Sequence, residues 1–280
     1  MQPDEYFMLV CLVSVSLIWF IMSIPVVRLQ VPKIYFTVRS WWWMLLLLFA
    51  AYISGALMLA LFFAMVGIRA MYEVGRILHP IGKQQLIKKL VQIHGNPQPL
   101  LVAPERIKNK SGKLSVIDWL VIICVGLFTV CAILLSFHLI NHHQGVMLFF
   151  VLFSSQFSDV AQYLCGKLFG RKWLPQPLFI KKISPNKTLE GAIVGPIFSS
   201  LIGGILGYWL INFPFWQCVT LAFSIAWLGI FGDLLESAFK RQHGIKDTCT
   251  ILAGHGGILD RIDSLLLSVP AFSLIYWLVL

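Results

Sequence analysis

Charged side chains are scarce in this sequence. Only 12% of the 280 residues are charged, 58% are hydrophobic, and the mean hydropathy is +0.82. A soluble domain carries about 25% charged residues. The scarcity therefore excludes an ordinary soluble protein and indicates an integral membrane protein. At roughly 20 apolar residues per span, the length bounds the number of spans rather than the number of soluble domains.

Two kinds of site are also missing. There is no CxxC pair and no Cys/His spacing typical of zinc, so the six cysteines are interpreted as small apolar residues in helices. The polar segments contain no plausible Ser-His-Asp arrangement, which argues against a hydrolytic triad. The first residues carry Asp4 and Glu5 where a signal peptide would be basic, and we expect a retained first helix.

The apolar runs predict an all-α, polytopic fold with about eight transmembrane helices. We divide the chain into an N-terminal region of three spans, 1–115, and a C-terminal catalytic domain of five spans, 116–280. The run 41–75 is too long for one helix across a ~30 Å core, so Ser54-Gly55 is predicted to form a tight hairpin. The expected spans are 6–27, 41–54, 57–75, 116–138, 146–168, 189–211, 216–238 and 262–280.

Acidic residues are outnumbered by basic ones, 12 against 22, giving a net charge of +10. In a membrane protein such cations act as topology signals and headgroup contacts, and no nucleic-acid partner is expected. They fall in alternate loops, whereas the loops near 55, 139–145 and 212–215 contain none. This alternation predicts cytoplasmic basic loops with both termini outside, as in a bacterial inner membrane protein.

Carboxylates gather near the predicted cytoplasmic ends of three spans. Asp159 lies within a span, where an ionisable group is costly and usually faces a polar cavity. Asp233 and Glu236 are three residues apart on one helical face, and Asp260 and Asp263 repeat that spacing in the last span. Oxygen ligands arranged in this way suit Mg²⁺. There are two alternatives to a metal site: Asp159 could pair with a basic neighbour to allow packing, and Asp233 and Glu236 could simply solvate a helix end.

The stripe that continues from Asp159 contains Gln162, Tyr163, Gly166 and Lys167. Lys187 follows a turn that begins at Ser184, and it precedes a helix that Thr188 is predicted to cap, which is a natural place for phosphate.

The loop before the last span adds glycines, whose backbone amides can approach a ligand closely, and further cations. A solvated loop is the alternative, but it does not explain paired acids on both flanking helices. Carboxylates that hold Mg²⁺ beside cations predict phosphoryl or nucleotidyl transfer at the lipid surface. The residues concerned are Lys240, Arg241, Lys246, Gly256 and Gly257.

At these positions the chain resembles the phosphatidate cytidylyltransferases, or CDP-diacylglycerol synthases. Upstream segments at 159–172, 183–191 and 232–237 resemble family motifs in the expected order, and 71–78 is a weak match. The long signature of the family is met by Ser237, Lys240, Arg241, Lys246, Asp247, His255, Gly256, Gly257, Asp260, Arg261 and Asp263.

The resemblance implies transfer of CMP from CTP to phosphatidate with Mg²⁺ as cofactor, and release of pyrophosphate. CTP, phosphatidate and membrane lipid are then the expected partners, together with a second copy in a homodimer. The implied catalytic residues are Asp233, Asp260, Lys187 and Asp263. The implied metal ligands are Asp233, Asp260, Glu236 and Asp159. The implied substrate-binding residues are Ser184, Lys240, Arg241, Lys246, His255, Gly256, Gly257 and Arg261.

Four departures from the family pattern, at Ser158, Leu189, Cys249 and Ala253, indicate a divergent paralogue. Two related enzymes stay open as alternatives: a CTP-dependent polyprenol kinase and a CDP-synthase for ether lipids. A third alternative is an ion-coupled transporter that uses Asp159 and Asp233 within its spans.

Overall fold

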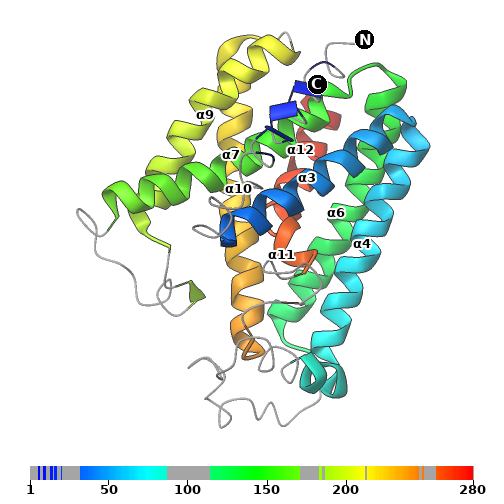
Figure 1. Ribbon diagram of the computed structural model, residues 1–280, viewed down its shortest axis with the longest axis vertical. Helices are drawn as coiled ribbons and strands as arrows, with labels where there is room; N and C mark the ends of the chain where they lie inside the picture. Colours follow the sequence, from blue (N-terminus) through cyan, green and yellow to red (C-terminus); the bar gives the residue numbers. More distant parts are fainter. Residues whose placement is uncertain are drawn as a thin grey trace.

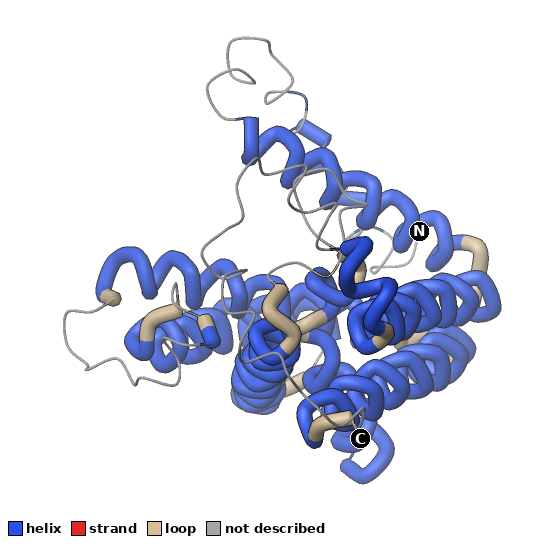
Figure 2. Tube along the Cα trace, turned by 90° about the horizontal axis from the view of Figure 1, so that it is seen from below, coloured by secondary structure: helices blue, strands red, loops and turns tan. Residues whose placement is uncertain are grey.

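All regular elements in the described part of the chain are α-helices. The computed structural model describes residues 32–86, 114–170, 183–184, 187–211, 213–245, 248 and 257–279, with a few positions between 6 and 20. Helices and connecting loops account for the whole described trace (Figure 2). In chain order the helices are α3 (Pro32–Ile53), α4 (Ala56–Leu78), α6 (Val116–Asn141), α7 (Val146–Phe169), α9 (Leu189–Ile211), α10 (Phe215–Gln242), α11 (Leu259–Ile262) and α12 (Leu265–Val279).

The predicted hairpin between the second and third spans is confirmed. α3 ends at Ile53 and α4 begins at Ala56, with Gly55 between them at φ 99° and ψ 177°. Residues with a Cβ avoid this backbone region, so glycine is required for the turn. The expected start at residue 41 was wrong, because α3 begins at Pro32 and takes in part of the basic loop.

α4 and α6 pack side by side along their length (Figure 1). Their contact is apolar, with the rings of Phe63 and Phe128 edge to face at 6.4 Å between centroids. α6 begins with a capping box: Ser115 N–H donates to Asp118 Oδ2 (2.8 Å), and Asp118 N–H donates to Ser115 Oγ (3.2 Å). These reciprocal bonds satisfy amides that the first helical turn leaves free and fix where α6 starts.

α9 packs against both α7 and α10. Its buried face consists mostly of small residues, among them Ser199, Ser200, Gly203 and Gly207. Small residues let helix backbones approach closely, which is the usual basis of helix association in a membrane. α12 packs on α6 and α10, and Figure 1 shows the short α11 between α10 and the α4–α6 pair. α12 covers nearly all of the expected last span, 262–280, and the four-residue α11 precedes it.

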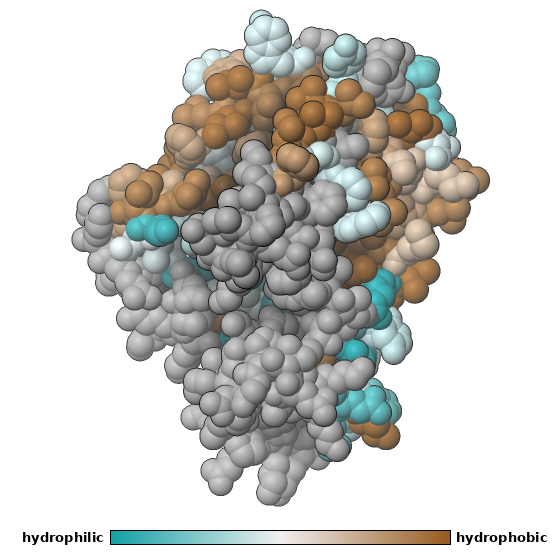
Figure 3. Space-filling view, viewed as in Figure 1, coloured by the Kyte–Doolittle hydropathy of each residue, from teal (hydrophilic) through white to brown (hydrophobic). Residues whose placement is uncertain are grey.

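The chain is a polytopic membrane protein. Four helices are long and apolar enough to cross a bilayer, namely α4, α6, α9 and α10. Hydrophobic side chains cover a broad upper part of the face in Figure 3. α7 is a continuous helix, but polar residues such as Gln156 and Asp159 interrupt its apolar sequence. Most of the expected first span lies outside the described residues. Eight spans therefore stays a prediction.

Charged helix ends meet at one end of the helix bundle. Arg76, near the end of α4, donates to Thr248 O (3.0 Å). Gln242 and His243, where α10 ends, contact the α6 N-terminus at Ser115 and Asp118. The connections α3–α4, α6–α7 and α9–α10 contain no Lys, Arg, Asp or Glu. The described ends of α4, α6 and α10 are therefore arranged as the predicted alternation of basic and uncharged connections requires.

Gly55→Ala is expected to cost about 1–3 kcal/mol of stability, because alanine must adopt a glycine-only backbone conformation. Gly75→Ala in α4 is the matched control: a Cβ there meets nothing within 4 Å, and alanine is favoured in a helix by roughly 0.5–1 kcal/mol. Thermal unfolding of both variants in detergent measures the difference. Equal melting temperatures would contradict the conformational argument.

Candidate active site

Three carboxylates from two parts of the chain form a cluster. Asp233 and Glu236 lie on one face of α10, and Asp263 joins them from the turn between α11 and α12. One ligand oxygen from each lies within 4.8 Å of the others. Ser237 Oγ donates to Asp233 Oδ1 (3.3 Å), one helical turn away on α10. An all-oxygen donor set of this size fits a hard divalent cation such as Mg²⁺.

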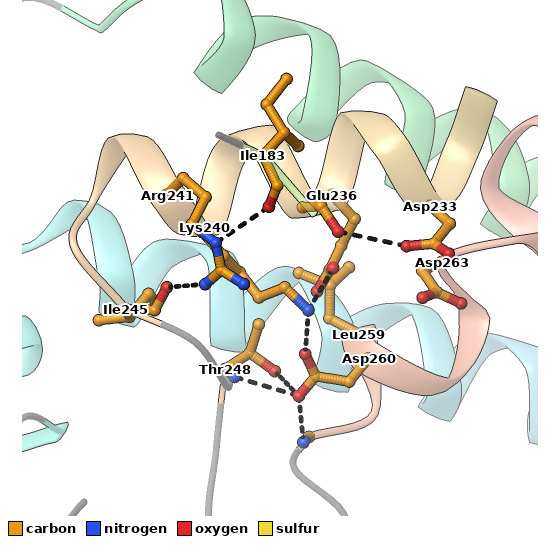
Figure 4. Close-up of polar contacts among 12 residues, drawn as sticks. Ile183, Asp233, Glu236, Lys240, Arg241, Ile245, Thr248, Leu259, Asp260 and Asp263 are labelled. Atoms are coloured by element: carbon orange, nitrogen blue, oxygen red, sulfur yellow. Dashed lines mark hydrogen bonds and ion pairs between the residues drawn. The ribbon is translucent and has the colours of Figure 1, made fainter. Parts of the chain in front are cut away.

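Lysine side chains neutralise part of this negative charge. Lys187, just before α9, forms an ion pair with Asp233. Lys240 lies between two acids, with its Nζ 2.5 Å from Glu236 Oε2 and 2.9 Å from Asp260 Oδ1 (Figure 4). Glu236 is fully buried, and a buried carboxylate needs such a counter-charge.

Asp260 is held by four donors. Its Oδ2 accepts from Gly257 N–H (2.6 Å), Thr248 N–H (3.1 Å) and Thr248 Oγ1 (2.9 Å), and its Oδ1 accepts from Lys240. Burial favours the neutral acid, but the Lys240 ammonium and the Gly257 amide outweigh it and lower the pKa of Asp260. Asp260 is therefore an anion with fixed orientation.

Asp263 has the opposite electrostatic environment. Burial, together with the negative charges of Asp233 and Asp159, raises the pKa of its carboxyl to about 8. The Asp263 side of the site is thus short of positive charge. A bound cation would relieve this repulsion, which supports the donor set as a metal site.

Four of the acids, Asp159, Asp233, Asp260 and Asp263, line a pocket of about 520 Å³. Ligand sites typically occupy 300–1,000 Å³. The predicted Asp159 stripe on α7 forms one wall, and the start of α9 forms another. The lining residues are Gln156, Asp159, Gln162, Tyr163, Gly166, Lys167, Lys187, Thr188, Gly191, Ala192, Asp233, Asp260, Arg261 and Asp263.

The pocket also offers donors for an anion. Arg261 Nε and one terminal nitrogen are buried without a hydrogen-bond partner among the described residues. Buried donors normally have partners, so a guanidinium with two unsatisfied nitrogens beside a pocket is suited to a phosphate. Thr188 Oγ1 accepts from Gly191 N–H (3.2 Å), which confirms the predicted cap next to Lys187.

Other predicted site residues lie away from the acid cluster or outside the described residues. Arg241 donates to the carbonyls of Ile183 and Ile245 (3.0 Å each) and holds two loop ends. Ser184 O accepts from Lys187 N–H (3.2 Å), consistent with the predicted turn. Lys246, His255 and Gly256 lie outside the described residues.

Sequence reasoning missed two polar residues that contact this site. Thr248 was not separated from the rest of the signature segment, although its hydroxyl bonds Asp260. Glu73 lies 3.6 Å from the Arg69 guanidinium on its own helix, and no local spacing indicated its contact with Thr248. The available signal was an acid inside an apolar helix, which is rare without a functional or structural partner.

A family model described as "Cytidylyltransferase family" matches residues 98–279, well over half of the chain. The chain belongs to the cytidylyltransferase family. The residues that carry the acid cluster, the pocket and the signature all lie within the matched region. The description of this family names cytidylyl transfer, which is a nucleotidyl-transfer reaction.

Several curated proteins are similar to this chain over part of its length. A phosphatidate cytidylyltransferase of Helicobacter pylori is 42% identical over 122 residues, which is 43% of this chain and 44% of that protein. One from Synechocystis is 37% identical over 142 residues, 50% and 45% of the two chains. The uncharacterized protein YnbB of Escherichia coli is 38% identical over 160 residues, 57% and 52%. The chain thus spans about half the length of the curated relatives it matches.

Lys240→Met is expected to destabilise the protein strongly in metal-free buffer. Removing one partner of a buried ion pair typically costs about 3–5 kcal/mol, since Glu236 keeps its charge without compensation. The double variant Lys240→Met/Glu236→Gln should recover most of the loss. Melting temperatures measured with a chelator present test this, and a double variant no more stable than the single one would refute the electrostatic explanation.

Proposed function

We propose that this protein transfers CMP from CTP to phosphatidate, giving CDP-diacylglycerol and pyrophosphate at the cytoplasmic face of a bacterial inner membrane. The observation that carries the proposal is the juxtaposition of the acid cluster with unpaired and paired cations around one pocket. The family and the names of the partial relatives support the same chemistry.

The residues suit such a reaction. Asp233, Glu236 and Asp263 would hold Mg²⁺, and Asp159 faces the same pocket. When bound, the metal ion supplies charge neutralisation for phosphate oxygens. Asp260 belongs to the proposed catalytic set, in which its fixed carboxylate keeps Lys240 in place.

The cations would act on the phosphates. Lys187 and Arg261 line the pocket and can bind the triphosphate or the lipid phosphate. A phosphatidate oxygen would attack the α-phosphorus of CTP, and the bond from that phosphorus to pyrophosphate would break. The attacking group is already an anion, so no side chain has to become a covalent nucleophile.

The proposal is tested with purified protein, phosphatidate, Mg²⁺ and CTP carrying separate labels in the cytosine ring and the γ-phosphate. Cytosine label is expected in the lipid product, and the γ-phosphate label in pyrophosphate. Parallel reactions contain a polyprenol or an ether-linked phosphatidate. Transfer of only the γ-phosphate label to a polyprenol would identify a kinase and overturn the proposal; exclusive use of the ether lipid would change the acceptor.

Asp260→Asn should reduce product formation roughly 100-fold or more, because one anion that holds Lys240 is lost from the site. A chelator should abolish the reaction, and added Mg²⁺ should restore it. Asp118→Asn, which removes a carboxylate from the α6 cap, is the control and should keep near-normal activity. An Asp260→Asn variant with full activity would refute the role assigned to this residue.

A further inference from the structure

A buried acid on α4 contacts the start of α11. Glu73 has no exposed surface. Its Oε1 accepts from Ile258 N–H and its Oε2 from Leu259 N–H, both at 3.1 Å. Burying a carboxylate is costly unless hydrogen bonds compensate, and these charge-assisted bonds do so. Glu73 therefore fixes the backbone immediately before Asp260.

Thr248 connects Glu73 to Asp260. Its hydroxyl lies 3.0 Å from Glu73 Oε2 and 2.9 Å from Asp260 Oδ2, so two carboxylates share one hydroxyl proton. Its amide also donates to Asp260, and its carbonyl accepts from Arg76 (3.0 Å). Thr248 is fully buried, so water does not replace these contacts.

The close approach of these groups requires glycine at position 257. A Cβ there would lie 2.1 Å from Glu73 Oε2 and 2.2 Å from Thr248 Oγ1. Neither oxygen can move away without breaking its bonds to α11 or Asp260. The same glycine donates its N–H to Asp260 at 2.6 Å. The Asp260 carboxylate is thus held by a connected set of hydrogen bonds that involves Gly257, Thr248 and Glu73.

We propose that Glu73 is a positioning residue for the candidate active site. Through Thr248 and the first amides of α11, it sets the orientation in which Asp260 meets Lys240 and Arg261 lines the pocket. The role of Asp260 in catalysis rests on the proposed function. The positioning itself depends only on the contacts of α4 with Thr248, Ile258 and Leu259.

The N-terminal region contributes residues that contact the candidate active site. Glu73 and Arg76 lie before residue 98, where the family match begins. Both make contacts with the signature segment across more than 170 positions of sequence. The N-terminal region is then part of the active-site structure as well as a membrane anchor.

Two variants test the proposal. Glu73→Gln keeps the shape of the side chain but replaces one acceptor oxygen with a donor, so the two α11 amides and Thr248 cannot all be satisfied. Thr248→Val removes only the hydroxyl that joins Glu73 to Asp260. Asp118→Asn is the matched control, because Asp118 is also a buried carboxylate that caps a helix, at α6.

The first measurement needs neither metal nor substrate. Amide hydrogen exchange over 257–262 is expected to accelerate at least tenfold in Glu73→Gln, since the Ile258 or the Leu259 amide then faces an NH2 group instead of an acceptor oxygen. In Thr248→Val the amides of Ile258 and Leu259 should stay protected. Asp118→Asn should leave the exchange of this segment unchanged.

The second measurement is Mn²⁺ binding to the full-length protein in detergent, with Mn²⁺ as the probe for the oxygen site. Residues that orient metal-site groups typically contribute 10–100-fold to affinity. Glu73→Gln and Thr248→Val should each weaken binding about tenfold or more, and Asp118→Asn should not. With CTP and phosphatidate, the concentration of Mg²⁺ for half-maximal rate should rise in the same two variants.

The inference is overturned if Glu73→Gln keeps wild-type exchange and Mn²⁺ affinity, or if Asp118→Asn loses affinity equally, which would mean general destabilisation. If Glu73→Gln does not fold, Thr248→Val decides, and wild-type Mn²⁺ affinity in that variant counts against positioning. If the wild-type protein makes no CDP-diacylglycerol, phosphatidate is not the acceptor and the proposed function fails. The hydrogen-exchange measurement still decides the role of Glu73 in that case.

Discussion

The ammonium group of Lys240 lies between Glu236 and Asp260, and the rest of the site depends on that placement. The ion pair between Lys240 and Asp260 joins α10 to α11, two helices that are separated by residues 243–258 of the chain. Buried ion pairs contribute little net stability, because desolvation offsets most of the attraction. What Lys240 contributes is geometry: with Asp260 fixed, the turn after α11 brings Asp263 to Asp233 and Glu236, where carboxylates alone would repel one another.

The carboxylates of the site are not compensated equally by positive charge and hydrogen-bond donors. Asp260 has four donors that favour its anion, whereas burial and the nearby Asp233 and Asp159 carboxylates disfavour the anion of Asp263. Arg261, between them in sequence, has buried donors without partners in the described residues. A carboxyl group that a cation would stabilise, Asp263, and a guanidinium that can still bind an anion, Arg261, thus line the same pocket. A metal-bound phosphate group would satisfy both at once, which is why the proposed chemistry fits these residues better than ion transport does.

The elements that the sequence predicted correctly depend on local spacing. Ser54-Gly55, the Thr188 cap and the stripe from Asp159 follow from turn chemistry and helical periodicity. The separate short helix α11 before the last span was not predicted. A turn follows it, in which Ser264 N–H donates to Asp263 Oδ1 (2.7 Å), and the apolar pattern does not reveal that turn. The contacts of Glu73 with Thr248, Ile258 and Leu259 were beyond such reasoning, because these partners lie 175 to 186 positions away. The mutual placement of Lys240, Glu236 and Asp260 likewise needs the tertiary fold.

The position of α4 shows why a few polar contacts matter so much here. Leu61, Met65, Ile68 and Tyr72 form an exposed apolar face, and the opposite face packs on α6. In lipid, apolar burial scarcely distinguishes one packing register from another, because hydrocarbon tails are as apolar as leucine. Hydrogen bonds between helices and loops do distinguish them. Glu73 and Arg76 make their bonds with the segment that carries Asp260, so the same contacts that fix the register of α4 also orient the acid. Membrane packing and site geometry are therefore determined together.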